Sequence, residues 1–458
     1  MGGASRQENI GYVLSVAASG QVALPSLSCP PPPAHCRLFR ICRFSRQCLP
    51  FLPKKQDLPM ANLTVTRIST LDALRPLSAA WAVLAGDVPF RAPSWLVPWW
   101  EYYGEPHPGR CVRCELCVLV VERAGAVVGI APWFVDRSPL WGNILKQLGA
   151  GEVCSDYQTL LAAPDCMSEV AAAVAGFLGA EMRNQWDRLD LDGCTVDDEA
   201  LAALVEELQS RGAPCERRRG PACWKVALPA TFDEYLATLS KSHRKQLRRL
   251  ERNVLDTSRA RWHTVRTADE FALAWPIFVD LHQRRRRSLG DGGCFSSPSF
   301  FAFHEEMART FLKNDALRLQ WLELDGRPIA AEYHLLAGDT LYGYQSGIDP
   351  DRLDEEPGRL AGIAVIRQAI DEGLAVYDLL RGDEPYKAHW RACPTPTEQL
   401  TLVNPRRRSR ARHKVHQFLR RIKYGLLGFS PKRENYLAPV TPPEVVEVES
   451  EEVCVAPS

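Results

Sequence analysis

The sequence has no hydrophobic run that approaches the ~20 consecutive apolar residues a membrane-spanning helix needs. It also has almost no net charge, because 56 basic residues face 55 acidic ones and leave +1. A charge field over the whole protein, of the kind that attracts nucleic acid or a membrane, is therefore not expected. The first residues, Met1 to Gly20, lack the basic segment and the apolar core of a secretory signal.

A regular cysteine framework is also absent. The fifteen cysteines are odd in number and irregularly spaced, which is not the pattern of a disulfide-stabilised fold. We therefore expect free thiols in a reducing compartment, and a cytoplasmic protein. The spacing of Cys111, Cys114 and Cys117 suggests a metal site, but no fourth cysteine follows at the right distance and the segment leads directly into an expected strand. The sequence predicts no metal.

The chain of 458 residues, 46% of them hydrophobic, has enough apolar material for two or three folded units. Residues 1–59 contain the proline run Pro30 to Pro33 and show little periodicity, so we expect a disordered extension or a mis-called start. An alternating strand pattern begins at Met60, which is the expected true start. Residues 436–458 are expected to form a disordered acidic tail.

Two α/β units are predicted, the first over 60–230 and the second over 231–404. Each contains a central hairpin, at 116–134 around an Ala-Gly turn and at 317–336 around an Asp-Gly turn. The second unit is expected to open with one helix over 231–253, which begins at a capping box. The fold class is therefore α/β, with mixed sheets.

The second unit is expected to end in a parallel crossover. A strand over 340–346 is followed by a loop, a helix over 360–372 and a strand over 375–380. In such a crossover the helix begins at the carboxyl end of the first strand, where ligands bind in open α/β sheets. The start of this helix is thus the first candidate binding site.

A basic amphipathic helix is predicted over 405–435. Its apolar stripe has two interpretations that the sequence leaves open: it lies on an anionic membrane surface, or it covers the domain. The stripe consists of Val415, Phe418, Leu419 and Ile422.

Most of the functional information lies between Asp325 and Trp390. This stretch contains Gly-Arg-Pro-Ile-Ala-Ala-Glu-Tyr (326–333), Gly-Tyr-Gln-Ser-Gly-Ile-Asp-Pro (343–350), Pro-Gly-Arg-Leu (357–360) and Tyr-Asp-Leu-Leu-Arg-Gly-Asp-Glu-Pro-Tyr-Lys-Ala-His-Trp (377–390). In this order the segments resemble the acetyltransferase domain of CelD-type proteins, a branch of the GNAT superfamily related to FemAB aminoacyl transferases. The resemblance extends over most of 60–400 and implies two tandem GNAT-like units.

The resemblance implies a bacterial acyl-CoA-dependent N- or O-acyltransferase that acts on a carbohydrate or amino-sugar intermediate of cellulose or exopolysaccharide synthesis. Two alternatives stay open: a non-catalytic GNAT-fold scaffold of a polysaccharide synthesis complex, and a FemAB-like aminoacyl transferase. The implied partners are acyl-CoA and a small-molecule or glycan acceptor, with peripheral contact to the inner membrane or to the synthesis complex. Nucleic acid is not expected.

A GNAT fold separates two strands and places a helix N-terminus at the gap, where backbone N–H groups and the helix dipole bind a pyrophosphate. The resemblance assigns this gap to the strand over 341–346 and the helix that begins near Leu360. The superfamily's Arg/Gln-x-x-Gly-x-Gly loop is not present in full, which leaves acyl-CoA, an acyl-carrier protein and an aminoacyl-tRNA as possible donors. The expected donor-binding residues are Tyr344, Ser346, Gly358, Arg359, Leu360 and Gly362.

Attack of an amine on a thioester needs orientation, a route for the amine proton and stabilisation of the oxyanion, rather than a covalent nucleophile. Glu332 is the candidate general base, and its alternative is to point to solvent. Asp378 and Lys387 are further catalytic candidates. Asp378 has a structural alternative, because a buried carboxylate needs a partner such as Arg381 or Lys387.

The acceptor side is expected to form where the last strand of the second unit ends, since these residues leave the strand at the edge where the helix begins. Tyr386, like Lys387, has a structural alternative as a surface or packing residue. The expected acceptor-binding residues are Arg381, Tyr386 and Trp390.

Overall fold

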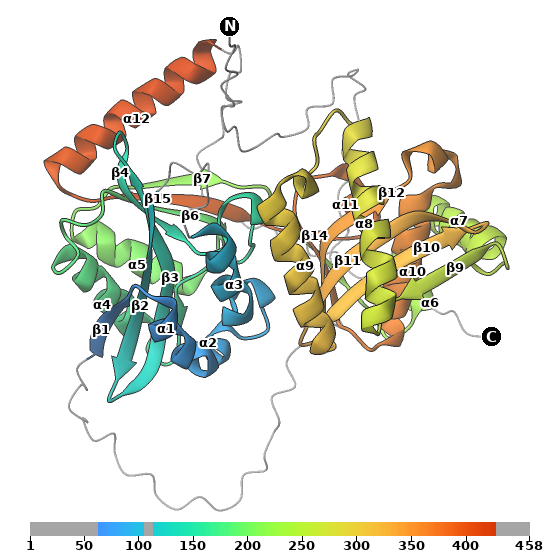
Figure 1. Ribbon diagram of the computed structural model, residues 1–458, viewed down its shortest axis with the longest axis horizontal. Helices are drawn as coiled ribbons and strands as arrows, with labels where there is room; N and C mark the ends of the chain where they lie inside the picture. The colour runs from blue at the N-terminus through green and yellow to red at the C-terminus, as the bar shows by residue number, and fades with distance from the viewer. Residues whose placement is uncertain (1–62, 105–112, 427–458) are drawn as a thin grey trace, which may run out of the picture. The chain divides into compact units, whose positions relative to one another are not determined.

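The computed structural model describes residues 63–104 and 113–426 (Figure 1). The predicted extension over 1–59, the predicted tail over 436–458 and Cys111 lie outside these residues. The strand pattern that starts near Met60 corresponds to β1 (Leu63–Ile68), the first element of the described chain.

Two mixed β-sheets form the framework, and their first five strands follow the same order. In each sheet these strands pair antiparallel until the last pair, which is parallel. This arrangement confirms the mixed α/β fold expected from the sequence. The strands of the first sheet are β1, β2 (Arg113–Arg123), β3 (Ala126–Ser138), β4 (Gly142–Gln147) and β6 (Arg188–Thr195). Those of the second sheet are β9 (Ala260–Thr264), β10 (Leu317–Leu324), β11 (Arg327–Ala337), β12 (Thr340–Ile348) and β13 (Val376–Arg381).

Both predicted hairpins form at the expected turns. Ala124 and Gly125 join β2 to β3 with φ of 51° and 81°, and Asp325 and Gly326 join β10 to β11 with φ of 53° and 79°. Positive φ at both central residues gives the type I′ turn, whose twist matches that of the flanking strands.

Helices connect and cover the two sheets. The parallel pair in each sheet is joined through a crossover helix, α4 in the first and α10 in the second. The helices are α1 (Leu71–Leu74), α2 (Ser78–Ala85), α3 (Pro93–Tyr103), α4 (Met167–Gly179), α5 (Glu199–Ser210), α6 (Phe232–Thr238), α7 (Lys241–Leu250), α8 (Ala268–Ser288), α9 (Pro298–Lys313), α10 (Pro357–Asp371), α11 (Pro385–His389) and α12 (Arg407–Leu426). The short β5 (Leu161–Ala162) pairs with β3.

The helix predicted over 231–253 is two helices. Its capping box forms as expected, since the Thr231 side chain accepts from the Glu234 amide and the Glu234 side chain from the Thr231 amide. The chain then leaves the helical conformation at Leu239 (ψ 156°), and Ser240 caps α7 by accepting from the His243 amide. A serine side chain that bonds the backbone three residues ahead competes with helix continuation, which explains the break.

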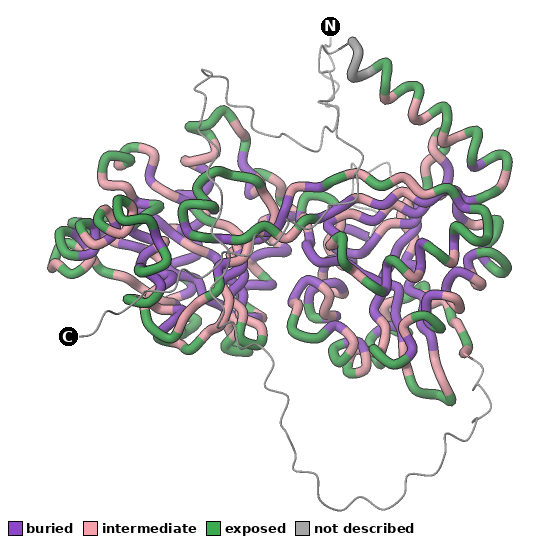
Figure 2. The backbone as a smooth tube through the Cα atoms, turned by 180° about the vertical axis from the view of Figure 1, so that it is seen from behind, coloured by how far each residue is buried: buried purple, intermediate pink, exposed green. Residues whose placement is uncertain are grey.

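Buried residues, purple in Figure 2, run through the strands of both sheets. Their hydrophobic side chains form three clusters. One packs α4 and α5 against the first sheet, and another packs α6, α7 and α10 against the second. The third joins the two halves of the chain: Trp95 on α3 and Phe303 on α9 meet edge to face, with ring centroids 5.1 Å apart. The two sheets therefore share one apolar core.

The last strands of each half are exchanged between the sheets. β8 (Cys223–Ala227) lies in the second sheet between β13 and β14 (Cys393–Thr395), whereas β15 (Thr397–Val403) lies in the first sheet between β6 and β7 (Cys215–Arg219). The sheets do not divide at residue 230 as predicted, because the chain enters the second sheet already with β8 and returns to the first with β15. A local strand pattern indicates a strand but not which sheet it joins.

We predict that Leu402→Ala weakens the first sheet, although Leu402 follows the second sheet in sequence. Leu402 is fully buried and lies opposite Leu189 and Cys215. Loss of its side chain should lower the free energy of unfolding by about 2–5 kcal/mol. Amide hydrogen exchange should accelerate first in β6 and β7.

The matched control is Ile366→Ala, which removes a fully buried side chain from α10. It should accelerate exchange in the second sheet instead. Faster exchange in β13 and β14 rather than in β6 and β7 of Leu402→Ala would show that β15 does not stabilise the first sheet.

Candidate functional site

Strands β12 and β13 separate after a short parallel contact. They pair only from Thr340 to Tyr342, opposite Val376 to Asp378, although β12 continues to Ile348. The chain of β13 bends away at Leu380, which has a φ of 53°. A gap thus opens at the carboxyl ends of both strands, and α10 follows β12 at this end.

The backbone of β12 is irregular at the same place. Tyr333 on β11 lies opposite Gln345, whereas the next residue, His334, lies opposite Gly343. Tyr344 is therefore the extra residue of a β-bulge, which interrupts regular pairing where the strands part.

Glu332 on β11 lies opposite Ser346, beside this gap. Its side chain is only 13% exposed, and its ion-pair neighbour in the described chain is His334, with Oε2 3.8 Å from Nε2. Burial raises the pKa of Glu332 to about 8. The carboxyl group therefore exchanges its proton close to neutral pH.

His334 does not compensate the charge of Glu332. Burial lowers the pKa of His334 to about 3, so its imidazole is neutral near pH 7, and its Nε2 lies 3.0 Å from the Tyr377 hydroxyl. This contact crosses β12 at Gly343, where a Cβ atom would lie 3.2 Å from the Tyr377 ring. Glu332, His334 and Tyr377 thus form one buried polar group that spans β11 to β13.

The N-terminus of α10 differs from the predicted donor cradle. The helix begins at Pro357, which has no N–H, rather than at Leu360. The amides of Arg359 and Leu360 donate to the Glu356 carbonyl, at 2.9 and 3.1 Å. The predicted cradle of amides from 358 to 362 is therefore smaller, and Gly358 remains as its accessible part. A Cβ atom on Gly358 would meet no heavy atom closer than Ile348 Cγ2 at 4.0 Å.

Several of the expected binding residues have packing roles in the structure. The Leu360 side chain is fully buried in the core of the second sheet. A Cβ atom on Gly362 would lie 2.4 Å from the Trp390 ring, so this glycine allows Trp390 to pack against α10. The Tyr344 hydroxyl donates to the Val153 carbonyl at 2.6 Å, whereas Ser346 is exposed.

A basic helix lies beside the start of α10. The Glu356 carboxylate accepts from Gln246 at 2.8 Å and from Arg249 at 3.1 Å, both on α7, and pairs with Arg359. His243 of α7 lies 5.9 Å from His389 on α11, measured between ring centroids. The basic residues of α7 are visible in the sequence, but the place of this helix beside α10 depends on tertiary packing.

Asp378 has partners other than those expected. Its Oδ2 accepts from the Tyr157 hydroxyl at 2.6 Å and lies 3.8 Å from Lys225 Nζ, and its Oδ1 accepts from the Leu380 amide at 2.8 Å. Burial raises its pKa to about 6, and the Tyr157 hydrogen bond opposes this shift. The carboxylate therefore holds the bend of β13 and joins it to the first half of the chain.

Arg381 and Lys387 are also engaged by the protein. Arg381 pairs with Asp156 and, at 3.2 Å, with Asp192. Lys387 is buried, and its Nζ donates to the carbonyls of Leu380 at 3.1 Å and Arg381 at 3.0 Å and lies 3.1 Å from a Glu384 carboxylate oxygen. Both residues are thus held by contacts within the protein and fix the chain around the gap.

Tyr386 is the expected acceptor-side residue that remains accessible. Its side chain is 52% exposed. Partial burial and the nearby carboxylates of Glu384 and Glu332 raise its pKa. Of the residues predicted for catalysis and acceptor binding, Glu332 lies beside the gap and Tyr386 is close enough to interact with its charge.

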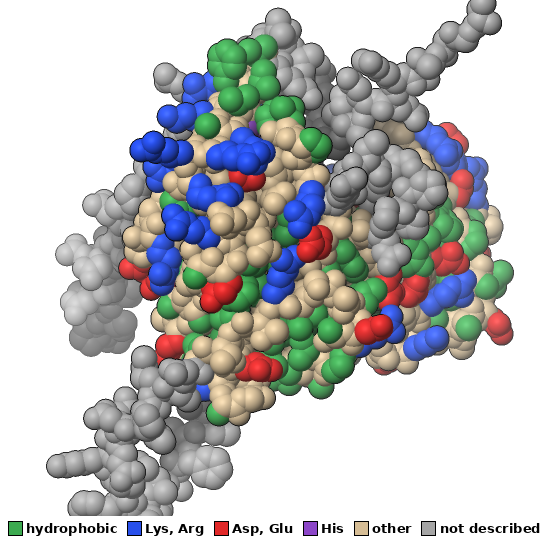
Figure 3. Space-filling model, turned by 60° about the vertical axis from the view of Figure 1, so that its left-hand side comes forward, with side chains coloured by type: hydrophobic (Ala, Val, Ile, Leu, Met, Phe, Trp, Pro, Cys, Tyr) green, Lys and Arg blue, Asp and Glu red, His purple; other side chains and the backbone are tan. Residues whose placement is uncertain are grey.

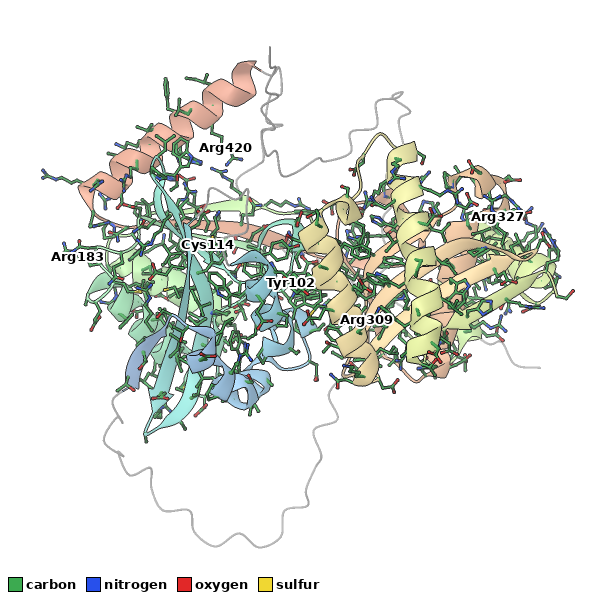
Figure 4. All side chains as sticks on the ribbon, viewed as in Figure 1. Tyr102, Cys114, Arg183, Arg309, Arg327 and Arg420 are labelled. Atoms are coloured by element: carbon green, nitrogen blue, oxygen red, sulfur yellow. The ribbon has the colours of Figure 1, made fainter. Side chains whose placement is uncertain are left out.

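The loop after β4 contributes residues that the sequence did not assign. Gly149 and Gly151 have φ of 82° and 87°, and the loop then places Asp156 and Tyr157 against β13. Contacts between α3 and α9 also join the two halves of the chain. The hydroxyl of Tyr102, labelled in Figure 4, donates to the Glu306 carboxylate at 2.6 Å. The two glycines indicate a tight loop in the sequence. The residues that this loop contacts, Asp378 and Arg381, lie more than 200 residues away, so the sequence does not reveal these contacts.

Within the residues described, no three His, Cys, Asp or Glu side chains are grouped as a metal site, and no helix is long and apolar enough to cross a membrane.

Comparison with known proteins identifies the enzyme class. Residues 241–388 match the family described as acetyltransferase (GNAT) domain. The chain thus contains a GNAT-type acetyltransferase domain and is an acyltransferase, and domains of this type use acyl-CoA. No curated protein sequence matches the chain significantly.

Three solved structures are similar to the chain. FemX is 11% identical with a TM-score of 0.49, over 73% of this chain and 96% of its own. The C-terminal domain of a protein described as a lysylphosphatidylglycerol synthetase, from Agrobacterium fabrum, is 12% identical with a TM-score of 0.42, over 71% and 92%. A tandem GNAT protein from the clavulanic acid biosynthesis pathway is 14% identical with a TM-score of 0.39, over 75% and 98%.

We predict that Glu332→Gln changes how stability depends on pH. The pKa of this carboxyl group is raised from 4.5 to about 8 in the folded protein. Between these values the group is ionised in the unfolded chain but keeps its proton in the folded protein. Stability of the parent should therefore fall between about pH 4.5 and 8, by at most ~1.4 kcal/mol per unit. The amide cannot ionise, so this slope should disappear.

The measurement is the melting temperature at pH 5 and pH 8. Glu206→Gln, at an exposed position of α5, is the control and should keep the slope of the parent. An equal pH dependence in Glu332→Gln and the parent would mean that Glu332 titrates as an ordinary exposed carboxylate.

Proposed function

We propose that the protein is an acyl-CoA-dependent N- or O-acyltransferase in which Glu332 accepts the proton of the attacking amine or hydroxyl. The observation that carries this proposal is a mostly buried carboxyl group at the gap between β12 and β13, which has no compensating cation among the residues that the structure describes. A pKa of about 8 suits a base that must take a proton and return it near neutral pH.

The acyl group passes directly from the thioester to the acceptor in this reaction. The acceptor nitrogen or oxygen attacks the thioester carbonyl carbon while its proton moves to Glu332. The carbon–sulfur bond then breaks, and the thiol of CoA leaves after taking up a proton. Backbone N–H groups at the Tyr344 bulge are suitable donors to the oxyanion, because the bulge interrupts regular pairing at this point.

The donor diphosphate is proposed to bind at the start of α10. Gly358 permits close approach of a phosphate, and Arg359 and Arg249 add positive charge on two sides. Both arginines now hold the Glu356 carboxylate, which stands where an anion is favoured by the helix dipole. A diphosphate would take the place of this carboxylate as their partner.

The acceptor is proposed to be a carbohydrate or amino sugar of cellulose or exopolysaccharide synthesis, as the resemblance to CelD-type proteins implies. Ser346 and Tyr386 offer accessible hydroxyl groups beside Glu332 for such an acceptor. The basic helix α7 favours a second candidate, a FemAB-like transfer from aminoacyl-tRNA. Binding of tRNA that weakens steeply with salt, without binding of acetyl-CoA, would support this second function.

Replacement of Glu332 by Gln should remove the base. With acetyl-CoA and glucosamine as the test pair, kcat/KM should fall by about 10²–10⁴-fold. In the parent kcat/KM should rise with pH through an inflection near 8, because only the ionised carboxylate accepts the proton. The inflection should be absent in the variant, and release of CoA thiol provides the measurement.

Glu206→Gln should keep both the rate and the profile. If Glu332→Gln retains the rate of the parent while the parent is active, another group accepts the proton.

Gly358→Val should weaken binding of acetyl-CoA by tenfold or more, which is ~1.4 kcal/mol, because the side chain blocks the approach of a phosphate to the backbone. The open space around Gly358 allows the substitution without a clash in the fold. Titration calorimetry measures the affinity.

Gly176→Val is the matched control, since Gly176 is an equally open glycine in the crossover helix of the first sheet. Its affinity for acetyl-CoA should equal that of the parent. Unchanged affinity in Gly358→Val would place the donor elsewhere.

A further inference from the structure

Helix α12, like α7, is basic and contains no acidic residue. Between Pro405 and Tyr424 the chain contains no Asp or Glu but many Arg and Lys residues. The helix follows β15, and it occupies the part of the predicted amphipathic segment that the structure describes.

The polar side of α12 packs on the first sheet. Ser409 Oγ donates to Asp187 at 2.6 Å, and Arg412 donates to the same carboxylate at 2.8 Å. One turn further, His413 lies 2.7 Å from Glu216, and Gln417 also bonds this carboxylate. These contacts recur every three or four residues, so they define one face of the helix.

The apolar side of α12 faces away from the protein. Val415, Phe418, Leu419 and Ile422 are exposed by 50%, 62%, 41% and 40%. Their spacing of three, four and seven residues places them on one stripe, opposite the face that holds Asp187 and Glu216. A surface helix of a globular protein normally has the reverse orientation, with its apolar stripe on the core. The interpretation that the stripe covers the domain is therefore wrong.

Positive charge borders the stripe. In Figure 3 hydrophobic side chains gather at one end of this face, with many Lys and Arg side chains beside them. Arg420 is partly buried and extends from α12 toward the first sheet (Figure 4). Among the residues of α12 whose burial is described, the exposed basic ones are Arg407, Arg408, Arg410, Lys414 and Arg421.

We infer that α12 attaches the protein to the surface of an anionic lipid bilayer. Apolar side chains in a stripe, bordered by cations and free of acids, fit the boundary between acyl chains and anionic headgroups. The polar contacts to Asp187 and Glu216 hold the helix with this stripe outward, so no rearrangement is needed before it meets a membrane. The chemistry that recognises the helix is the phosphate of the headgroup together with the acyl chains beneath it.

The test is co-sedimentation of the full chain with vesicles of phosphatidylcholine alone and with about one third phosphatidylglycerol. The parent should bind the anionic vesicles and bind less as salt increases. The double variant Phe418→Ser with Ile422→Ser should lose at least tenfold in partitioning. Because both side chains point away from the fold, the melting temperature should stay that of the parent.

Two further variants distinguish the contribution of the apolar stripe from that of exposed apolar side chains in general and from that of the positive charges. Leu273→Ser removes an apolar side chain, 68% exposed, from α8 and should bind like the parent. Arg407→Glu with Arg408→Glu should reduce binding to anionic vesicles only, while the apolar stripe is intact.

Three outcomes would overturn the inference. The first is equal partitioning of the stripe variant and the parent. The second is a concentration-dependent dimer of the parent that Phe418→Ser with Ile422→Ser abolishes, which would assign the stripe to a second copy. The third is vesicle binding that occurs only after deletion of 443–458, which would mean that this acidic segment binds the stripe in the full chain.

Discussion

The exchange of β8 and β15 between the two sheets is the constraint on which the rest of the structure depends. Each strand lies between two strands of the opposite half, so neither sheet is complete without a segment that is distant in sequence. Because β8 pairs with β13 on the side away from the gap, it fixes the strand whose departure from β12 creates the gap. The exchange thus connects the stability of the first half to the geometry of the site.

The separation of β12 and β13 follows from local contacts around Leu380. Asp378 binds the Leu380 amide, and Lys387 binds the Leu380 carbonyl, so the two side chains hold the bend from both directions. Tyr157 and Asp156 then attach the bend to the loop of the first half. These charged groups are costly to bury alone, and their mutual contacts offset that cost. Glu332 has no compensating cation in the described part of the chain, so burial raises its pKa to about 8.

Local patterns predicted most elements of the fold. The turns at Ala124-Gly125 and Asp325-Gly326, the capping box at Thr231 and the crossover through α10 all depend on residues close in sequence. The position of β15 and the partners of Asp378 depend on contacts across more than 150 residues, and no periodicity reports these. The candidate site shows the same difference between what local sequence patterns reveal and what depends on distant contacts. Glu332 was identifiable as a lone acid in an apolar strand. Lys387 was a catalytic candidate in the sequence, but the structure shows that it is buried and donates to two backbone carbonyls.

The segment that matches the acetyltransferase family is smaller than the structural unit around the site. Residues 241–388 include β12, β13 and α10 but not β8, which lies before them and borders β13. Lys225 on β8 faces Asp378, and Tyr157 from the first half binds the same carboxylate. A chain limited to the matching segment would leave Asp378 buried without its partners and one edge of β13 unpaired. The first half is therefore a structural part of the candidate site, even though the match to the acetyltransferase family lies in the second half.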